Sequence, residues 1–324
     1  MKAVKSILVY NSSEVVGLLR ISCLKGFSSI QLNLGMRPLE LIECPRDAIQ
    51  GWPHPVSTAD KLAYYRTLLD VGFNCLDLGS FVSHKAVPQM ADTRAVCNAL
   101  HDEGKLEGTT STLVIVANER GAKEALATPG IDFIGFPLSL SETFQLRNTR
   151  ATSTEALERL QNIRSLVEGS DIRIVVYLSM GFGNPYGDDW GAQMVTDWTG
   201  KLNELIKPEV VSLSDTVGQA SPDLLKDVFT TVFNHFPNQS IGAHLHATPW
   251  DAPAKIQAAW DAGCRRFDGA LRGIGGCPMA QDALVGNLAT ETIVETLGLH
   301  EKLDLDMRAW NQAMSLAVDL FQSA

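Results

Sequence analysis

From residue 38 onward, short runs of aliphatic and β-branched residues alternate with longer stretches in which apolar residues recur at helical spacing. Each pair occupies roughly thirty residues, which is the rhythm of repeated βα units. We expect strands at residues 39–43, 75–79, 111–116, 132–138, 172–179, 209–214, 240–246 and 265–271. Helices are expected at 58–72, 86–104, 153–170, 191–206, 221–236, 249–263 and 306–321.

Eight strands with helices between and after them predict an α/β fold, the (β/α)8 or TIM barrel, with an extra C-terminal helix. A doubly wound open sheet is the alternative. Such a sheet usually has a glycine-rich phosphate turn after its first strand, and the segment ECPRDAIQG at 43–51 is not one. A chain of 324 residues with 45% hydrophobic content can bury a barrel-sized core, so we expect a single barrel domain over residues 37–324.

The first 36 residues are expected to be an N-terminal extension outside the fold. They are slightly basic, contain short apolar runs and show no settled period. A targeting peptide is the alternative. No small-residue cleavage site follows a proper apolar core, and Glu14 together with few arginines is unlike an organellar transit peptide.

Bulk composition excludes several classes of partner. The net charge of −10 argues against general affinity for nucleic acid or acidic membranes, so an anionic substrate would need a local basic pocket. No uncharged apolar run approaches the ~18 residues of a membrane-spanning helix. The six cysteines show neither the paired spacing of a zinc site nor the density of a disulfide scaffold. We therefore expect a soluble protein of the reducing cytoplasm.

Polar residues gather where the predicted strands end, which in a TIM barrel is where catalytic groups lie. Taken singly, such a residue is more often a turn or helix-cap residue. Their coincidence at so many strand ends favours an active site. The residues concerned are Arg46, Asp47, Gln50, Asp77, Ser80, Tyr177, Asp215, His244 and His246.

A glycine-rich stretch follows the eighth predicted strand, at residues 270–291. Its glycines permit backbone angles closed to other residues, and Pro278 stiffens the turn after Cys277. Asn287 and Glu291 follow where the chain continues as a helix. We interpret the stretch as an active-site loop. An ordinary turn, with Cys277 as a small buried hydrophobe, is the alternative.

A metal site is predicted from the segment HLH at 244–246. Residues two apart on a strand project on the same side, so His244 and His246 can face one ion. Asp47 and Asn287 would add two oxygen ligands when the barrel closes. This set contains no thiolate and therefore favours Mg²⁺ or Mn²⁺ over structural zinc.

Several motifs resemble those of the 3-hydroxy-3-methylglutaryl-CoA lyases, metal-dependent lyases with a TIM-barrel fold. The segments concerned lie at 45–50, 80–90, 212–218, 244–246 and 273–291, and the resemblance extends over residues 39–297. The Gly–Gly–Cys–Pro loop is the most specific of them, because the related acyl-transferring synthases lack this cysteine loop.

The resemblance implies a role for each matching position. Metal ligation is implied for Asp47, His244, His246 and Asn287, charge stabilisation for Arg46, and proton transfer for Cys277. Asp215 and Glu291 would support the polar site, and Asp77 occupies a position where well-known members have a glutamate. The positions that match residues near the substrate are Gln50, Ser80, Asn148, Tyr177 and Ser212.

The implied reaction is a retro-Claisen cleavage of 3-hydroxy-3-methylglutaryl-CoA to acetoacetate and acetyl-CoA, as in leucine degradation. The resemblance also implies a homo-oligomer, a dimer or larger. Two positions depart from the family pattern: Asp77, and Ala247, which stands where an aspartate usually follows HLH. These departures motivate the alternative that the substrate is another 3-hydroxyacyl thioester or a hydroxy acid. Ala247 further predicts that a hydrogen-bond partner of the metal ligands is missing. A metal-binding barrel without catalysis is the third hypothesis.

Overall fold

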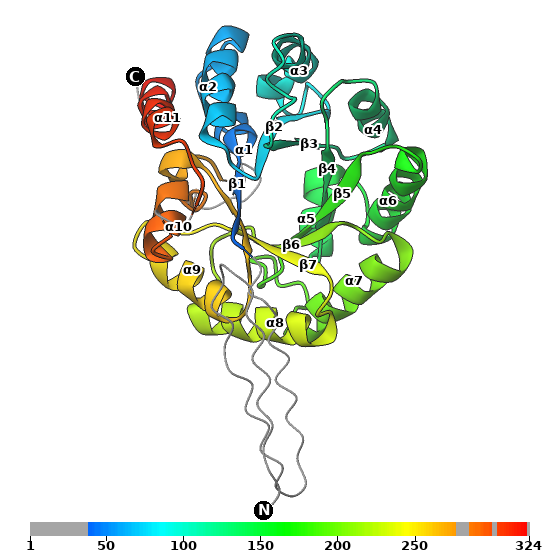
Figure 1. The fold of residues 1–324 in the computed structure, drawn as a ribbon. Helices are drawn as coiled ribbons and strands as arrows, with labels where there is room; N and C mark the ends of the chain where they lie inside the picture. Colours follow the sequence, from blue (N-terminus) through cyan, green and yellow to red (C-terminus); the bar gives the residue numbers. More distant parts are fainter. Residues whose placement is uncertain (1–37, 277–284, 300–302, 323–324) are drawn as a thin grey trace, which may run out of the picture. The chain divides into compact units, whose positions relative to one another are not determined.

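The computed structural model describes residues 38–276, 285–299 and 303–322, and these belong to a compact unit that begins at Pro38. Its eight strands form a closed parallel barrel in which each strand pairs with the next and β8 pairs with β1 (Figure 1). The strands are β1 Glu40–Glu43, β2 Cys75–Ser80, β3 Ser111–Ile115, β4 Phe133–Ser139, β5 Arg173–Ser179, β6 Val210–Asp215, β7 Ser240–Leu245 and β8 Arg266–Gly269. The predicted TIM barrel is confirmed, whereas the N-terminal extension lies outside the described residues.

The helices form a ring around the barrel (Figure 1). They are α1 Pro45–Gln50, α2 Thr58–Val71, α3 Thr93–Asp102, α4 Glu119–Leu126, α5 Glu142–Thr149, α6 Ser153–Val167, α7 Ala192–Leu205, α8 Pro222–His235, α9 Ala252–Asp261, α10 Thr290–Thr296 and α11 Met307–Leu320. Two 3₁₀ turns, η1 Pro88–Met90 and η2 Leu271–Gly273, precede α3 and follow β8. Among the described residues, none of the helices combines the length and the apolar character needed to cross a membrane.

The predicted strands and helices are all found, with two local differences, and two further helices that were not predicted, α4 and α5, follow β3 and β4. The helix expected from residue 86 begins only at Thr93, because Pro88 starts the separate turn η1. The segment after β1, for which no helix was expected, forms helix α1. Pro45 at its first position and Asp47 in its first turn are both favourable at a helix start.

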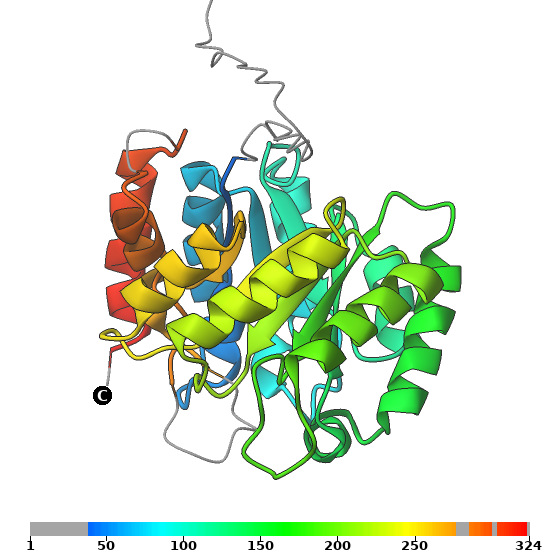
Figure 2. The same cartoon turned by 90° about the horizontal axis from the view of Figure 1, so that it is seen from below.

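Apolar residues form two layers. The larger cluster lies between the strands and the surrounding helices, and a smaller one, which includes Ile42, Leu113 and Val175, fills the barrel interior. The predicted C-terminal helix α11 packs against α2 on the outside of the ring (Figure 2). Asp306 caps it by accepting hydrogen bonds from the amides of Arg308 and Ala309.

Glu43 at the end of β1 is a fully buried carboxyl group that links β1 to two other elements. It accepts a hydrogen bond of 2.8 Å from the amide of Leu271 in η2. The hydroxyl of Thr290, at the start of α10, lies 2.5 Å from its other oxygen. Burial raises the pKa of Glu43 to about 8, although both of these hydrogen bonds oppose the shift. The group is therefore largely protonated in the folded protein at neutral pH.

We predict that Glu43→Gln flattens the pH dependence of stability. The unfolded chain releases this proton near the ordinary pKa of 4.5, whereas the folded protein keeps it up to about pH 8. Between these values the unfolded state binds fewer protons, so the free energy of unfolding falls as pH rises, by at most about 1.4 kcal/mol per unit. Glutamine can form both hydrogen bonds without ionising. Urea unfolding at several pH values measures the slope, with exposed Glu204→Gln on α7 as the control. Equal slopes in both variants would contradict the prediction.

Candidate metal centre and active site

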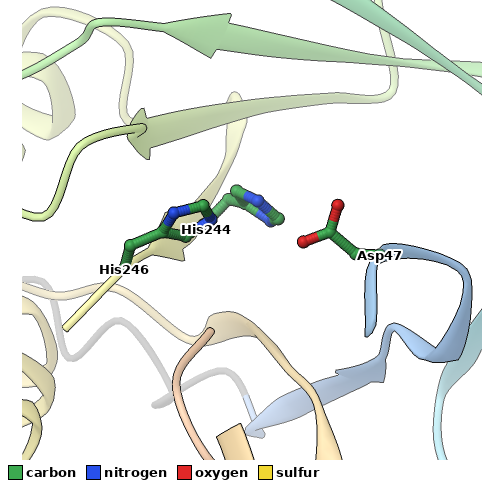
Figure 3. Close-up of side chains that lie close together, drawn as sticks. All are labelled: Asp47, His244 and His246. Atoms are coloured by element: carbon green, nitrogen blue, oxygen red, sulfur yellow. The ribbon is translucent and has the colours of Figure 1, made fainter. Parts of the chain in front are cut away.

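Three potential metal ligands meet at the C-terminal end of the barrel. One ligand atom each from Asp47, His244 and His246 can be chosen so that all lie within 4.8 Å of one another. Asp47 lies on α1, directly after β1, while His244 is on β7 and His246 follows its last residue. Figure 3 shows the carboxylate on one side and the two imidazoles on the other. The structure thus brings three of the four predicted ligands into one cluster.

Asp268 on β8 orients the first of these imidazoles. Its Oδ2 lies 3.1 Å from Nδ1 of His244, which leaves Nε2 as the nitrogen available to an ion. Burial lowers the pKa of His244, but this hydrogen bond and the charge of Asp268 outweigh it and raise the pKa. The expectation of a missing hydrogen-bond partner was therefore wrong for His244, since a neighbouring strand supplies the carboxylate.

Two atoms of the cluster have no hydrogen-bond partner among the described residues: Oδ2 of Asp47 and Nε2 of His246, both buried. Burial, and then the neighbouring His244, lower the pKa of His246 to about 4, so its imidazole is neutral. Burial alone would raise the pKa of Asp47, but Arg46 and the two histidines lower it to about 2. An anionic oxygen and a neutral imidazole nitrogen, both without partners among the described residues, fit a divalent cation.

Asn287 lies next to the cluster through its backbone, which forms an antiparallel bridge with His246. Its Nδ2 donates a hydrogen bond of 2.9 Å to the carbonyl of Ile274, so Oδ1 is the atom left for an ion. Gly275 must be a glycine here, because its φ is +102° and a Cβ would lie 2.6 Å from Nδ2 of Asn287 and 2.8 Å from the carbonyl oxygen of Asp47.

Arg46 is a buried guanidinium held on two sides. Its Nε and Nη2 donate to Oδ2 of Asp77 at 3.0 and 2.5 Å, and its Nη1 donates to Oδ1 of Asp47 at 2.8 Å. Gln50 donates to the same Asp47 oxygen at 2.8 Å. Burial raises the pKa of Asp77 to about 6, against the opposing charge of Arg46. Asp77 therefore reaches Arg46 directly and orients it.

A cavity of about 600 Å³ opens above the cluster. Of the predicted site residues, those among its lining residues are Arg46, Asp47, Gln50, Ser80, Asn148, Tyr177, His244 and His246. The ring of Tyr177 lies edge-on to that of His244, with centroids 5.4 Å apart. Cys277 lies outside the described residues.

Four predicted residues are not among the described residues that line this cavity. Asp77 contacts Arg46, and Ser212 is buried with no partner for its hydroxyl among the described residues. Asp215 lies 2.8 Å from the ammonium group of buried Lys255, and both carboxylate oxygens of Glu291 accept from the amide of Arg272 at 3.1 Å. These groups can act on the site only through other residues in the arrangement described.

Sequence reasoning missed several functional candidates. Asp268 could have been noticed as a carboxylate in the middle of a predicted strand. Lys85, Arg147 and Arg150 also line the cavity, and Asp47 is the one acidic residue among its described lining residues. The local basic pocket that an anionic substrate requires is thus present in a chain of net charge −10.

We predict that His246→Ala lowers Mn²⁺ affinity by more than about 10-fold, since residues that only orient a ligand already contribute 10- to 100-fold. Titration of metal-free protein with Mn²⁺ measures this directly. His235→Ala provides the control, because His235 is exposed on α8 and bonds only the carbonyl of Thr231 in its own helix. Equal affinity in both variants would remove His246 from the metal site.

Comparisons with known proteins show the family of this chain. The HMGL-like family model matches residues 41–314. The mitochondrial hydroxymethylglutaryl-CoA lyase of Macaca fascicularis is 31% identical over 292 residues, 89% of this chain and 88% of that protein. The 3-hydroxy-3-isohexenylglutaryl-CoA/hydroxymethylglutaryl-CoA lyase of Pseudomonas aeruginosa is 30% identical over 275 residues, 84% and 89% of the two chains.

A solved structure shares both the fold and the sequence pattern. The HMG-CoA lyase of Acinetobacter baumannii in complex with coenzyme A and 3-methylmalate superposes with a TM-score of 0.77 at 28% identity, covering 87% of this chain and 91% of that chain. With the family match extending over most of the barrel, the sequence comparisons lead to one conclusion: this chain belongs to the HMGL-like family of carbon–carbon lyases.

Proposed function

We propose that this protein cleaves 3-hydroxy-3-methylglutaryl-CoA to acetoacetate and acetyl-CoA in a metal-dependent retro-Claisen reaction. The cluster of Asp47, His244 and His246 beside the fixed guanidinium of Arg46, at a cavity with basic residues, is the observation that carries the proposal. The names of the relatives from Macaca and Pseudomonas support the choice of substrate.

Asp47, His244, His246 and Asn287 would hold the ion, and their oxygen and imidazole donors suit Mg²⁺ or Mn²⁺. A bound divalent ion supplies Lewis acidity, which lowers the pKa of the substrate alcohol and fixes the geometry of its oxygens. The protein's own part is to keep the ligands in the right state. Asp47 is anionic at pH 7 because of the positive charges around it, and His246 is neutral chiefly because it is buried.

Arg46 would stabilise the negative charge that develops on the thioester carbonyl as the carbon–carbon bond breaks. It lines the cavity, and its two carboxylate partners, Asp77 and Asp47, prevent it from turning away. A donor held in place before the reaction needs no reorganisation in the transition state. The role of Asp77 is therefore to position Arg46.

Coenzyme A carries phosphate groups, and the cavity has matching charges. Lys85, Arg147 and Arg150 line it, with Arg147 and the predicted substrate residue Asn148 both on α5. Guanidinium groups are well suited to phosphate oxygens. The coenzyme A in the Acinetobacter structure supports an acyl-CoA substrate for this chain also. Gln50, Ser80 and Tyr177 would complete the polar lining near the acyl group.

Cys277 would donate the proton that converts the product enolate to a stable thioester. A thiol of ordinary pKa is mostly protonated at neutral pH, as this role requires. Asp215 and Glu291 would support the site indirectly, through Lys255 and the backbone of Arg272. We also propose, from the family resemblance, that the active form is a dimer or larger homo-oligomer.

A second candidate substrate is a related thioester with a longer branch at carbon 3. The Pseudomonas relative is named for 3-hydroxy-3-isohexenylglutaryl-CoA as well as for the methyl compound. One part of the cavity lining here is formed by small apolar side chains, those of Val82, Ala86, Val87 and Ala117, which could contact such a branch. The chemistry at the metal would be unchanged.

Product analysis tests the proposed function. Purified protein with Mg²⁺ is expected to release acetoacetate and acetyl-CoA from 3-hydroxy-3-methylglutaryl-CoA, to lose activity on chelation, and to regain it with Mn²⁺. Cleavage of only the longer-branched thioester would replace the first substrate by the second. Absence of cleavage of either thioester by metal-loaded, folded protein would overturn the proposal.

We predict that Cys277→Ser lowers kcat by about 10²- to 10⁴-fold, the usual contribution of a positioned acid or base, while Mn²⁺ affinity stays near wild type. Cys97→Ser is the matched control, since Cys97 is fully buried in the core on α3. That variant should lose melting temperature and keep its turnover. If Cys277→Ser behaves in the same way, Cys277 is a packing residue and has no role in proton transfer.

A further inference from the structure

Lys255 on α9 is a buried lysine that the proposed chemistry does not use. It is 3% exposed, and its ammonium group has an acceptor for each of its three protons. It donates to Oδ2 of Asp215 at 2.8 Å, to the carbonyl of Gly218 at 2.7 Å and to the carbonyl of His246 at 3.0 Å. Neither Lys255 nor Asp215 is among the described lining residues of the cavity.

The three acceptors belong to two neighbouring strand ends. Asp215 ends β6, Gly218 lies in the turn that follows, and His246 directly follows β7. Asp215 also accepts hydrogen bonds from the amides of Gln219 at 3.0 Å and Ala220 at 3.1 Å. One ammonium group and one carboxylate therefore fix the turn after β6 to the main chain of the metal-ligand candidate His246.

The orientation of His246 depends on this main chain more than that of His244 does. His244 is held by the carboxylate of Asp268. The amide of His246 donates to the carbonyl of Asp215 at 3.3 Å, and its own carbonyl accepts from Lys255 at 3.0 Å. Its Nε2 has no partner among the described residues. Anything that shifts the backbone around Asp215 would therefore also shift this imidazole.

We propose that Lys255 is a positioning residue for the metal site: with Asp215 it fixes the backbone at His246, and thereby sets the affinity of the site for a divalent ion. This inference rests on the metal dependence proposed above. It also gives Asp215 a function that needs no contact with substrate. Lys255 and Asp215 form a single unit, because removing either partner leaves a buried charge without compensation.

A purely stabilising buried ion pair is the competing explanation, and the chain contains a matched example. Lys61 on α2 is also 3% exposed. It too pairs with an aspartate, the partly exposed Asp92 at 2.7 Å, and with a main-chain carbonyl, that of Gln89. Lys61 contacts none of the ligand candidates. The two lysines are therefore equally buried and have the same types of partner. They differ in that only Lys255 donates a hydrogen bond to a metal-ligand candidate, His246.

The experiment compares Lys255→Met with Lys61→Met in the full-length protein. Both should lower the melting temperature. Only Lys255→Met should weaken Mn²⁺ binding to metal-free protein, by about 10- to 100-fold, the range for residues that orient metal ligands. Its kcat should recover to within a few-fold of wild type at saturating Mn²⁺. An Mn²⁺ affinity within about twofold of wild type in Lys255→Met would overturn the proposal.

A double variant covers the case in which Lys255→Met does not fold. Lys255→Met combined with Asp215→Asn removes both charges, so no buried carboxylate is left uncompensated. The ammonium bond to the carbonyl of His246 is still lost, so the weakened Mn²⁺ binding should persist in this better-folded protein. Wild-type affinity in the double variant would overturn the inference alone. A wild-type protein that binds no Mn²⁺ would instead overturn the proposed function.

Discussion

The closure of the barrel between β1 and β8 is the constraint on which the site depends. In this pairing Ile42 lies opposite Asp268, and on the other side of β8 His244 lies opposite the same residue. Asp268 is thus placed where it can orient His244. Asp47 follows β1 within one short helix, so closure brings it to the histidines of β7. Backbone hydrogen bonds between parallel strands therefore determine which polar groups meet.

Charge compensation then determines how these groups behave. A buried carboxylate is costly unless a cation or several donors are close to it. Three carboxylates each lie within hydrogen-bonding distance of a basic side chain: Asp77 of Arg46, Asp268 of His244 and Asp215 of Lys255. One carboxylate oxygen of Asp47 accepts hydrogen bonds from both Arg46 and Gln50, while its other oxygen has no partner among the described residues. The acceptor left free at this point is the reason to place a cation there.

Two departures from the family pattern have local structural solutions. The shorter side chain of Asp77 forms a two-nitrogen contact with Arg46, which holds the guanidinium without touching the cavity. Ala247 offers no hydrogen bond from its side chain, but Asp268 orients one histidine, and Asp215 and Lys255 hold the main chain of the other. In this chain the partners of the two histidines come from β8 and from the end of β6.

The sequence by itself determined the barrel, its eight strands and most of the ligand candidates. Alternating apolar runs define βα units locally, and the spacing in HLH places His244 and His246 on one side of a strand whatever surrounds it. Helices α1, α4 and α5 were missed because six or eight residues give too short a pattern to recognise. Only the tertiary structure decided that Asp268 pairs with His244, that Lys255 pairs with Asp215 and that Glu43 links β1 to α10 through Thr290. These partners are separated by 24, 40 and 247 positions in the chain, and no local pattern specifies contacts that form only when strands and helices pack.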